Sequence, residues 1–204
     1  MPVDKSLSYY GWIYHKILDP LTAEERRGAA DLIPTASSVV DIACGTGQLS
    51  QALRKKGCRV LGIDISLRML RFAESHNRYA DVQYRHLDAT GLDELADRAF
   101  DYATLILLLH ELPREKQAQA LREALRVARR AVLVDSKAPL PLNANGRAVR
   151  LVEATIGRDH HPHFQAFLAG GGIPGVLERS GLAVTVEHRA TFSRDCREVF
   201  VLSA

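Results

Sequence analysis

The sequence has few cysteines and little excess charge. Its three cysteines, Cys44, Cys58 and Cys196, are far apart, odd in number and never spaced as CxxC. We therefore expect reduced thiols, with neither a disulfide framework nor a zinc site. The net charge is only +3, and the lysines and arginines are dispersed along the chain, so the composition does not favour a nucleic-acid partner.

Long hydrophobic segments are also missing. The longest apolar run, residues 103–109 around one threonine, is far shorter than the about 20 residues of a membrane helix. The N-terminal segment lacks the apolar core of a signal peptide. We therefore expect a cytoplasmic protein without stable membrane insertion. With 204 residues, 47% of them hydrophobic and 25% charged, the chain is long enough for one ordinary globular domain.

The most informative stretch is a buried strand followed by a glycine-rich loop. Residues 39–42 form an apolar strand with Asp41 near its end, and Gly45 and Gly47 follow at once. These glycines permit a sharp turn and close approach of a ligand to the backbone. A helix is expected over 48–55, and a second strand (58–63) ends in Asp64, where an acid can accept hydrogen bonds from ribose hydroxyls. This order predicts a nucleoside site.

Strands and helices continue to alternate along the chain. Further strands are expected over 82–87, 100–109 and 131–135, with helices over about 66–76, capped by Ser66, and 114–128. Alternation of this kind predicts an α/β fold with a doubly wound parallel sheet.

The two ends of the chain depart from this alternation. Residues 6–32 read as helical, with Thr22 as an N-cap and Glu25 at the capping-box position. Residues 137–175 contain four prolines, a Gly-Gly-Gly triplet and helical stretches near 143–156 and 161–169. A helix over 175–180 precedes an expected terminal hairpin of residues 182–191 and 196–202. We expect one domain over 1–204, with a helical cap (1–36) and a substrate-side insertion (137–175).

The glycine loop does not fit the two commonest nucleotide motifs. A dinucleotide fingerprint needs a third glycine where Ser50 stands, and no GxxxxGK[ST] phosphate loop is present. The negative charge of Asp41 would repel phosphates but suit an amine-bearing ligand.

Five motifs in order resemble those of class I S-adenosylmethionine-dependent methyltransferases. They are Asp41–Gly47 (motif I), Gly62–Ser66, His86–Ala89, Phe100–Leu112 (motif IV) and Val132–Asp135. The variant D-x-A-x-G-T-G is most similar to the small-molecule branch that acts on ubiquinone and menaquinone precursors, and Ala43 replaces a glycine common in that family. The resemblance implies a Rossmann-like, seven-stranded, mostly parallel sheet with a C-terminal antiparallel hairpin and an N-terminal helical cap.

The resemblance also assigns roles to individual residues. Gly45 and Gly47 would approach the methionyl part of S-adenosylmethionine, Asp41 its amino group, Asp64 the ribose and Asp88 the adenine. For Asp41 and Asp88, purely structural roles stay open. Tyr14 resembles a tyrosine that closes over the cofactor, although it also suits a core position. The other cofactor contacts implied are Ala43, Cys44, Ile65, Ala89 and the backbone of Leu105 or Ile106.

His110 is the candidate general base at the end of strand 100–109. An ordinary histidine pKa near 6.5 suits proton transfer at neutral pH, and plant-type O-methyltransferases have a histidine followed by an acid at the similar place, here His110-Glu111. Lining of the substrate pocket is an equal alternative. His163, in the run from Asp159 to His163, is expected to face the substrate, because Pro162 and the lack of a second ligand cluster disfavour a metal site.

The predicted function is methyl transfer from S-adenosylmethionine to the oxygen, carbon or nitrogen of a small molecule, with an aromatic, quinone-like or lipid-like acceptor favoured. No Asn-Pro-Pro-Tyr-type motif follows strand 100–109, which disfavours amide or exocyclic-amine targets in proteins and DNA. Two alternatives remain open: a regulatory protein that binds the cofactor without catalysis, and a nicotinamide-dependent reductase, which Ser50 disfavours.

Overall fold

A single sheet of seven strands organises the chain. The computed structural model describes residue 16, residues 19–156 and residues 160–204. The strands run in the order β3-β2-β1-β4-β5-β7-β6. The first five are parallel, whereas β7 is antiparallel to both of its neighbours. This confirms the predicted fold. The strands are β1 (Ser38–Ile42), β2 (Arg59–Asp64), β3 (Gln83–His86), β4 (Phe100–Ile106), β5 (Ala128–Ser136), β6 (Thr185–Phe192) and β7 (Arg197–Ser203).

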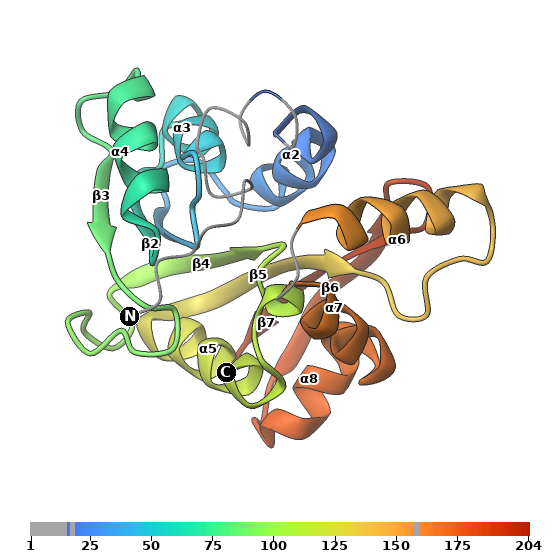
Figure 1. Ribbon diagram of the computed structural model, residues 1–204. Coiled ribbons are helices and arrows are strands. Elements are labelled where there is room, and N and C mark those ends of the chain that lie inside the picture. The colour runs from blue at the N-terminus through green and yellow to red at the C-terminus, as the bar shows by residue number, and fades with distance from the viewer. Residues whose placement is uncertain (1–15, 17–18, 157–159) are drawn as a thin grey trace.

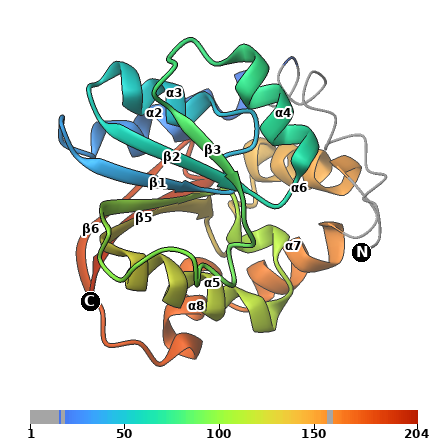
Figure 2. The ribbon, with the colours of Figure 1, turned by 90° about the vertical axis from the view of Figure 1, so that its left-hand side faces the viewer.

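Helices cover both faces of the sheet (Figures 1 and 2). One face carries α2 (Ala23–Asp31), α3 (Gln48–Lys55) and α4 (Leu67–His76), and the other carries α5 (Arg114–Val127), α7 (His160–Ala169) and α8 (Gly172–Ser180). The remaining helix, α6 (Ala144–Ile156), lies beyond the carboxyl end of β5. Among the described helices, none is both long and apolar enough to cross a membrane.

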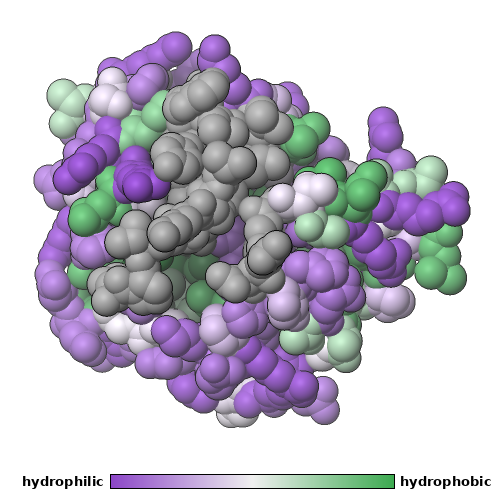
Figure 3. All heavy atoms as spheres, viewed as in Figure 1, coloured by the Kyte–Doolittle hydropathy of each residue, from purple (hydrophilic) through white to green (hydrophobic). Residues whose placement is uncertain are grey.

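Each face of the sheet has its own hydrophobic core. On one side, Ile33, just after α2, and Leu53 of α3 pack on Val39 and Val132. On the other, leucines of α5 and apolar side chains of α7 and α8 pack on Ile42 and Leu133. Because both faces of β1, β4 and β5 are covered, these strands are almost continuously buried. The surface in Figure 3 is largely hydrophilic, with hydrophobic side chains in small groups, some of them over α6.

The sheet changes direction between β1 and β4. The chain leaves β1 toward β2 and β3 on one side, and β4 then starts the other half of the sheet. In open parallel sheets this switch point leaves a crevice beyond the carboxyl ends of the strands, where ligands bind. The glycine loop after β1 and the residues after β4 both lie there.

Strand β4 is shorter than the sequence predicts. It ends at Ile106 instead of residue 109, because Leu107 adopts a left-handed conformation (φ 57°) and donates its N–H to Val134 O (2.8 Å). Residues Leu109–Glu111 form a 3-10 turn, η2. His110 therefore lies in a turn beyond the strand and not at its last position.

Two helix starts differ in how well the sequence predicts them. Ser66 caps α4 as expected, since its side chain accepts a hydrogen bond from Met69 N–H. At α2, Thr22 makes no side-chain capping hydrogen bond, and Glu25 is buried facing the C-terminal hairpin, so the predicted capping box is wrong. Residues 6–15, 17 and 18 of the segment expected to be helical, including Trp12 and Tyr14, lie outside the described residues.

Candidate functional site

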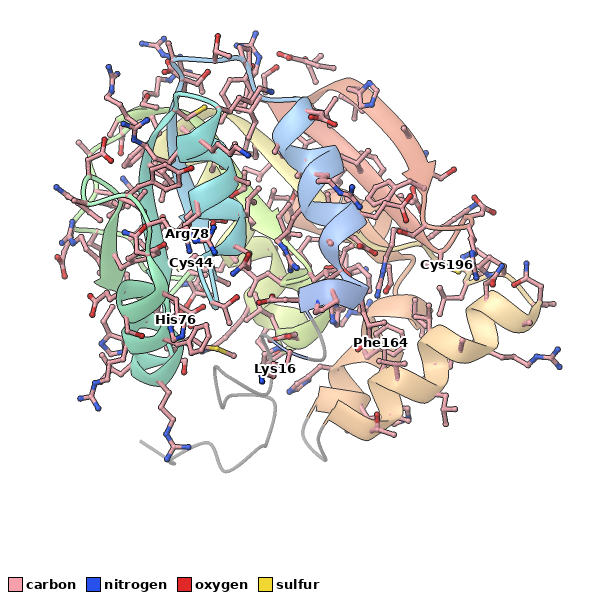
Figure 4. All side chains as sticks on the ribbon, turned by 90° about the horizontal axis from the view of Figure 1, so that it is seen from above. Lys16, Cys44, His76, Arg78, Phe164 and Cys196 are labelled. Carbon is pink, nitrogen blue, oxygen red and sulfur yellow. The ribbon has the colours of Figure 1, made fainter. Side chains whose placement is uncertain are left out.

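A cavity of about 610 Å³ opens beyond the carboxyl ends of the strands. This volume lies within the about 300–1,000 Å³ range of small-molecule sites. One part of its wall comes from the glycine loop and the ends of β2 and β4. The other part comes from α2, η2, α6 and the residues before β7. Seen from above, α2 runs between Cys44 of the loop and Cys196 before β7 (Figure 4).

The glycine loop places open backbone at the cavity. Gly45 has φ of +54°, and a Cβ built on it would meet no atom within 4 Å, so a ligand can approach its backbone. Gly47 has φ of +75°, and a Cβ there would lie 2.4 Å from the Tyr84 hydroxyl oxygen. Gly45 thus faces the ligand space, while Gly47 lets the loop pack closely on Tyr84 of β3.

Asp64 ends β2 and contacts both the loop and α4. Its Oδ2 accepts a hydrogen bond from Gly45 N–H (2.8 Å), and its Oδ1 accepts one from Ser66 N–H (2.7 Å). Burial raises the pKa of this carboxyl, although both N–H groups oppose the rise. Each oxygen keeps a second lone pair, and Asp64 lines the cavity. It can therefore also accept hydrogen bonds from ligand hydroxyls.

Asp41 is held inside the protein by two hydroxyl groups. Ser50 Oγ donates to its Oδ2 (2.6 Å), and Thr104 Oγ1 donates to its Oδ1 (2.7 Å). Burial outweighs these hydrogen bonds and raises the pKa of Asp41 to about 6. Asp41 borders a small hollow of about 40 Å³ beside the main cavity. Ser50 stands where a dinucleotide fingerprint has its third glycine, and here its hydroxyl holds Asp41 of β1 by a hydrogen bond.

The remaining loop residues are close to the cavity as well. Ala43 borders both hollows and has φ of 58°, a conformation that suits glycine better than alanine. Cys44 borders only the smaller one, and burial raises the pKa of its thiol. The protonated thiol fits a packing residue and not a reactive one.

Of the other predicted cofactor contacts, some line the cavity and some do not. Ile65 lines the cavity, and its side chain is about half exposed. Leu105 is buried inside β4, whereas its neighbour Ile106 lines the cavity. Asp88 accepts hydrogen bonds from Thr90 N–H (2.9 Å) and Thr90 Oγ1 (2.7 Å) and holds its own turn. Neither Asp88 nor Ala89 is among the residues that line the cavity.

The imidazole of His110 lies between two carboxylates. Its Nδ1 is 2.6 Å from Asp135 Oδ1, and its Nε2 is 3.7 Å from Glu153 Oε2. Burial lowers the pKa of His110, but the negative charges of Asp135 and Glu153 outweigh it, and the pKa rises to about 9. The expected value near 6.5 is therefore wrong for this environment, and the imidazole is protonated at neutral pH.

These groups belong to a chain of alternating charges. Arg197 of β7 lies between two acids, with Nη2 3.5 Å from Glu153 Oε1 and Nε 3.4 Å from Glu25 Oε1. The order is Asp135, His110, Glu153, Arg197, Glu25, and all five side chains are buried. Arg197 Nη1 also donates to Ser136 Oγ. We call this set the ion chain. It joins η2, β5, α6, β7 and α2 at one end of the cavity.

The histidine-rich segment has a different position from the one predicted. His161, Pro162 and His163 lie in the first turn of α7, where a proline is tolerated. His163 is not among the cavity-lining residues; the next residue, Phe164, is fully buried and packs edge-on against the His110 ring, with centroids 5.7 Å apart. In the described part of the chain, no group of three or more His, Cys, Asp or Glu residues is arranged to hold a metal ion.

Comparison with known proteins agrees with this architecture. Residues 39–131 match the family model described as "Methyltransferase domain". This part of the chain, 93 of its 204 residues, is thus similar in sequence to a methyltransferase domain. Solved structures with the same fold as this chain include S-adenosylmethionine-dependent methyltransferases from Aquifex aeolicus (18% identity, TM-score 0.66, 95% of this chain and 98% of that one covered) and Mesorhizobium loti (19%, 0.63, 87% and 96%).

Curated relatives match a shorter part of the chain. The ubiquinone biosynthesis O-methyltransferase of Paracidovorax citrulli (strain AAC00-1) is 36% identical over 78 residues, which are 37% of this chain and 33% of that protein. That of Methylococcus capsulatus (strain ATCC 33009 / NCIMB 11132 / Bath) is 40% identical over 76 residues, 36% and 32% of the two chains. The match thus spans about a third of each relative.

The cavity fits S-adenosylmethionine, the cofactor in the names of the two structural neighbours. The space beside the Gly45 backbone is open because glycine has no Cβ. Asp64 offers carboxylate oxygens to the cavity, and Ile65 and Met69 give it apolar surface. A nucleoside with a short amino-acid tail needs these three features together.

Proposed function

We propose that this protein transfers a methyl group from S-adenosylmethionine to a small molecule bound at the ion-chain end of the cavity. The observation that carries the proposal is the continuity of one cavity. Gly45 and Asp64 line one end of it, and His110, Glu153 and Arg197 line the other. A donor and an acceptor bound in that space lie next to each other, and such positioning is a large part of the catalysis of a displacement.

The donor end is formed by residues of the matched domain. Asp64 would accept hydrogen bonds from the ribose hydroxyls, and the backbone at Gly45 would contact the methionyl part. We propose that Asp41, through its hydrogen bonds to Ser50 and Thr104, fixes the loop and adds negative charge near the amino group. When bound, the cofactor supplies a methyl group already activated by a sulfonium charge.

His110 serves best as a positioning residue at the acceptor end. A protonated imidazole donates hydrogen bonds and accepts no proton, so a general-base role at neutral pH does not fit a pKa of about 9. Between Asp135 and Glu153, His110 keeps the Glu153 carboxylate at the wall of the cavity. The acceptor is a small molecule in this proposal; the O-methyltransferase relatives support an oxygen nucleophile.

Calorimetric titration of the purified protein tests the cofactor assignment. S-adenosylmethionine and S-adenosylhomocysteine should both bind at one site per chain, and NADH should not compete. A Gly45→Val variant, whose side chain would fill the open space at the loop, should lose this binding while it stays folded. Tight binding of NADH without binding of S-adenosylmethionine would refute the proposal and favour a reductase.

A further inference from the structure

The ion chain ends at a carboxylate oxygen that has no hydrogen-bond partner among the described residues. Glu25 Oε1 accepts a hydrogen bond from Ser193 Oγ (3.1 Å) and lies 3.4 Å from Arg197 Nε. In the part of the chain that the structure describes, Glu25 Oε2 is buried without a hydrogen-bond partner. The side chain as a whole is only 3% exposed, and it lines the cavity. A buried carboxylate oxygen without a donor is costly, so this position needs an explanation.

The two ends of the ion chain differ in how they are satisfied. At the far end, Asp135 accepts hydrogen bonds from the N–H groups of Ser136 (2.6 Å) and His110 (3.2 Å) in addition to the His110 ring. At the cavity end, the one cation paired with Glu25 among the described residues is Arg197, which Glu25 shares with Glu153. The next partner in the alternation would be a positive group, and it would lie in the cavity.

The charge balance points in the same direction. Three carboxylates (Asp135, Glu153, Glu25) face two cations (His110, Arg197) in the ion chain, which leaves one negative charge among the described residues. Among the other described residues that line this end, acids also outnumber cations, with Glu24 and Glu111 beside Arg194. Such a wall attracts cations and repels carboxylates.

We propose that the methyl acceptor carries a positively charged nitrogen that pairs with Glu25 Oε2. The inference rests on the proposed function and makes it more specific, because it identifies the acceptor class as small molecules with an ammonium group apart from the atom that is methylated. Glu25, Glu153, Ser193 and Arg197 all lie outside the matched residues 39–131. The acceptor end is therefore a feature of this chain that the family match does not describe.

Three probes of nearly equal shape test the charge preference. They are 4-(2-aminoethyl)catechol, 4-ethylcatechol and 3-(3,4-dihydroxyphenyl)propionate, which carry a positive, a neutral and a negative side group. Each is titrated by calorimetry into protein saturated with S-adenosylhomocysteine. We expect the cationic probe to bind about 10- to 150-fold more tightly than the neutral one, the usual range for a charge-assisted hydrogen bond, and the anionic probe to bind most weakly.

Variants on helix α2 show whether Glu25 causes the preference. Glu25→Gln keeps the size and the Ser193 hydrogen bond but removes the charge, so the cationic and neutral probes should bind equally. Glu25→Asp should retain part of the preference and gives a second variant if Glu25→Gln does not fold. Asp31→Asn changes an exposed acid of the same helix outside the cavity and should behave like the parent.

The outcomes separate this inference from the proposed function. Equal binding of the three probes to the parent, or no binding of the cationic one, would overturn the inference while cofactor binding stands. If Glu25→Gln weakens S-adenosylhomocysteine binding and leaves the probe preference unchanged, then Glu25 faces the cofactor, and the inference is wrong. Failure of the parent to bind S-adenosylhomocysteine would remove the proposed function itself.

Discussion

Replacement of Asp64 by alanine should weaken cofactor binding strongly and stability moderately. The change removes the acceptor of two backbone hydrogen bonds, from Gly45 N–H and Ser66 N–H, and the proposed contacts to the ribose. A hydrogen bond to a charged group contributes about 1.5–3 kcal/mol, which corresponds to a loss of roughly 10- to 150-fold in affinity. The two orphaned N–H groups should together lower the free energy of unfolding by about 2–4 kcal/mol.

Asp101 provides a matched control for this variant. Its Oδ2 also accepts two hydrogen bonds, from Ser38 N–H (2.8 Å) and Ser38 Oγ (2.7 Å). However, Asp101 lies near the start of β4, at the end of the strand opposite to the cavity. Asp101→Ala should therefore lower stability without any change in the dissociation constant for S-adenosylmethionine. The assay is calorimetric titration beside urea unfolding. A folded Asp64→Ala variant with the affinity of the parent would refute the assignment of Asp64 to the cofactor.

Variants at three further positions test the geometry around the site. The pKa of His110 rises from 6.5 to about 9 on folding, so its protonated form stabilises the fold by roughly 3 kcal/mol below pH 6.5, and this stabilisation is lost as the pH rises through 9. The difference in unfolding free energy between parent and His110→Asn, measured by urea unfolding, should therefore shrink between pH 6.5 and 9. A difference that stays constant over this pH range would contradict the charge pairing. Ser50→Ala removes one of the two hydroxyl donors to Asp41 and should cost about 1–3 kcal/mol of unfolding free energy at pH 7; no loss would mean that this hydrogen bond contributes nothing. Tyr84→Phe should retain cofactor affinity and Tyr84→Ala should lose it, because the Tyr84 ring packs closely against Gly47 and Gly62. Equal affinities of the two variants in calorimetric titration would show that this packing does not hold the loop.

The fold could be predicted because its signals are local. The apolar runs of β1, β4 and β5, the glycines after β1 and the acid at the end of β2 are each visible within a few residues. The end of β4 was predicted wrongly because Leu107 is apolar like the strand before it, and its left-handed backbone leaves no trace in the hydrophobic pattern.

The acceptor end of the cavity could not be predicted in the same way. Glu25, Glu153 and Arg197 come from three elements that are far apart in sequence, and each alone reads as an ordinary surface residue of a helix or strand. Glu25 even fits a local capping pattern that the structure does not contain. The raised pKa of His110 depends on this same long-range arrangement, so the expectation of an ordinary histidine followed from the sequence alone. In the ion chain, only His110 and Asp135, which follow or end predicted strands, gave a signal in the sequence.

The segments expected to surround the acceptor allow a separate prediction. We still expect residues 1–36 and 137–175 to act as cap and insertion around the acceptor, since α2 and α6 both contribute to the ion chain. Limited proteolysis with and without S-adenosylhomocysteine tests this expectation: the cofactor product should slow cleavage within both segments. Unchanged cleavage rates would count against closure around a ligand.

The most direct test of the central claim is transfer of a labelled methyl group. The protein is incubated with S-adenosylmethionine tritiated at the methyl group and a small-molecule metabolite extract, and the small molecules are then separated from the cofactor and counted. The parent should place label in a small-molecule product, whereas Asp64→Ala at the same cofactor concentration should place far less. Binding of S-adenosylmethionine without any label in the small-molecule fraction would contradict the account and indicate a protein that binds the cofactor without transferring its methyl group.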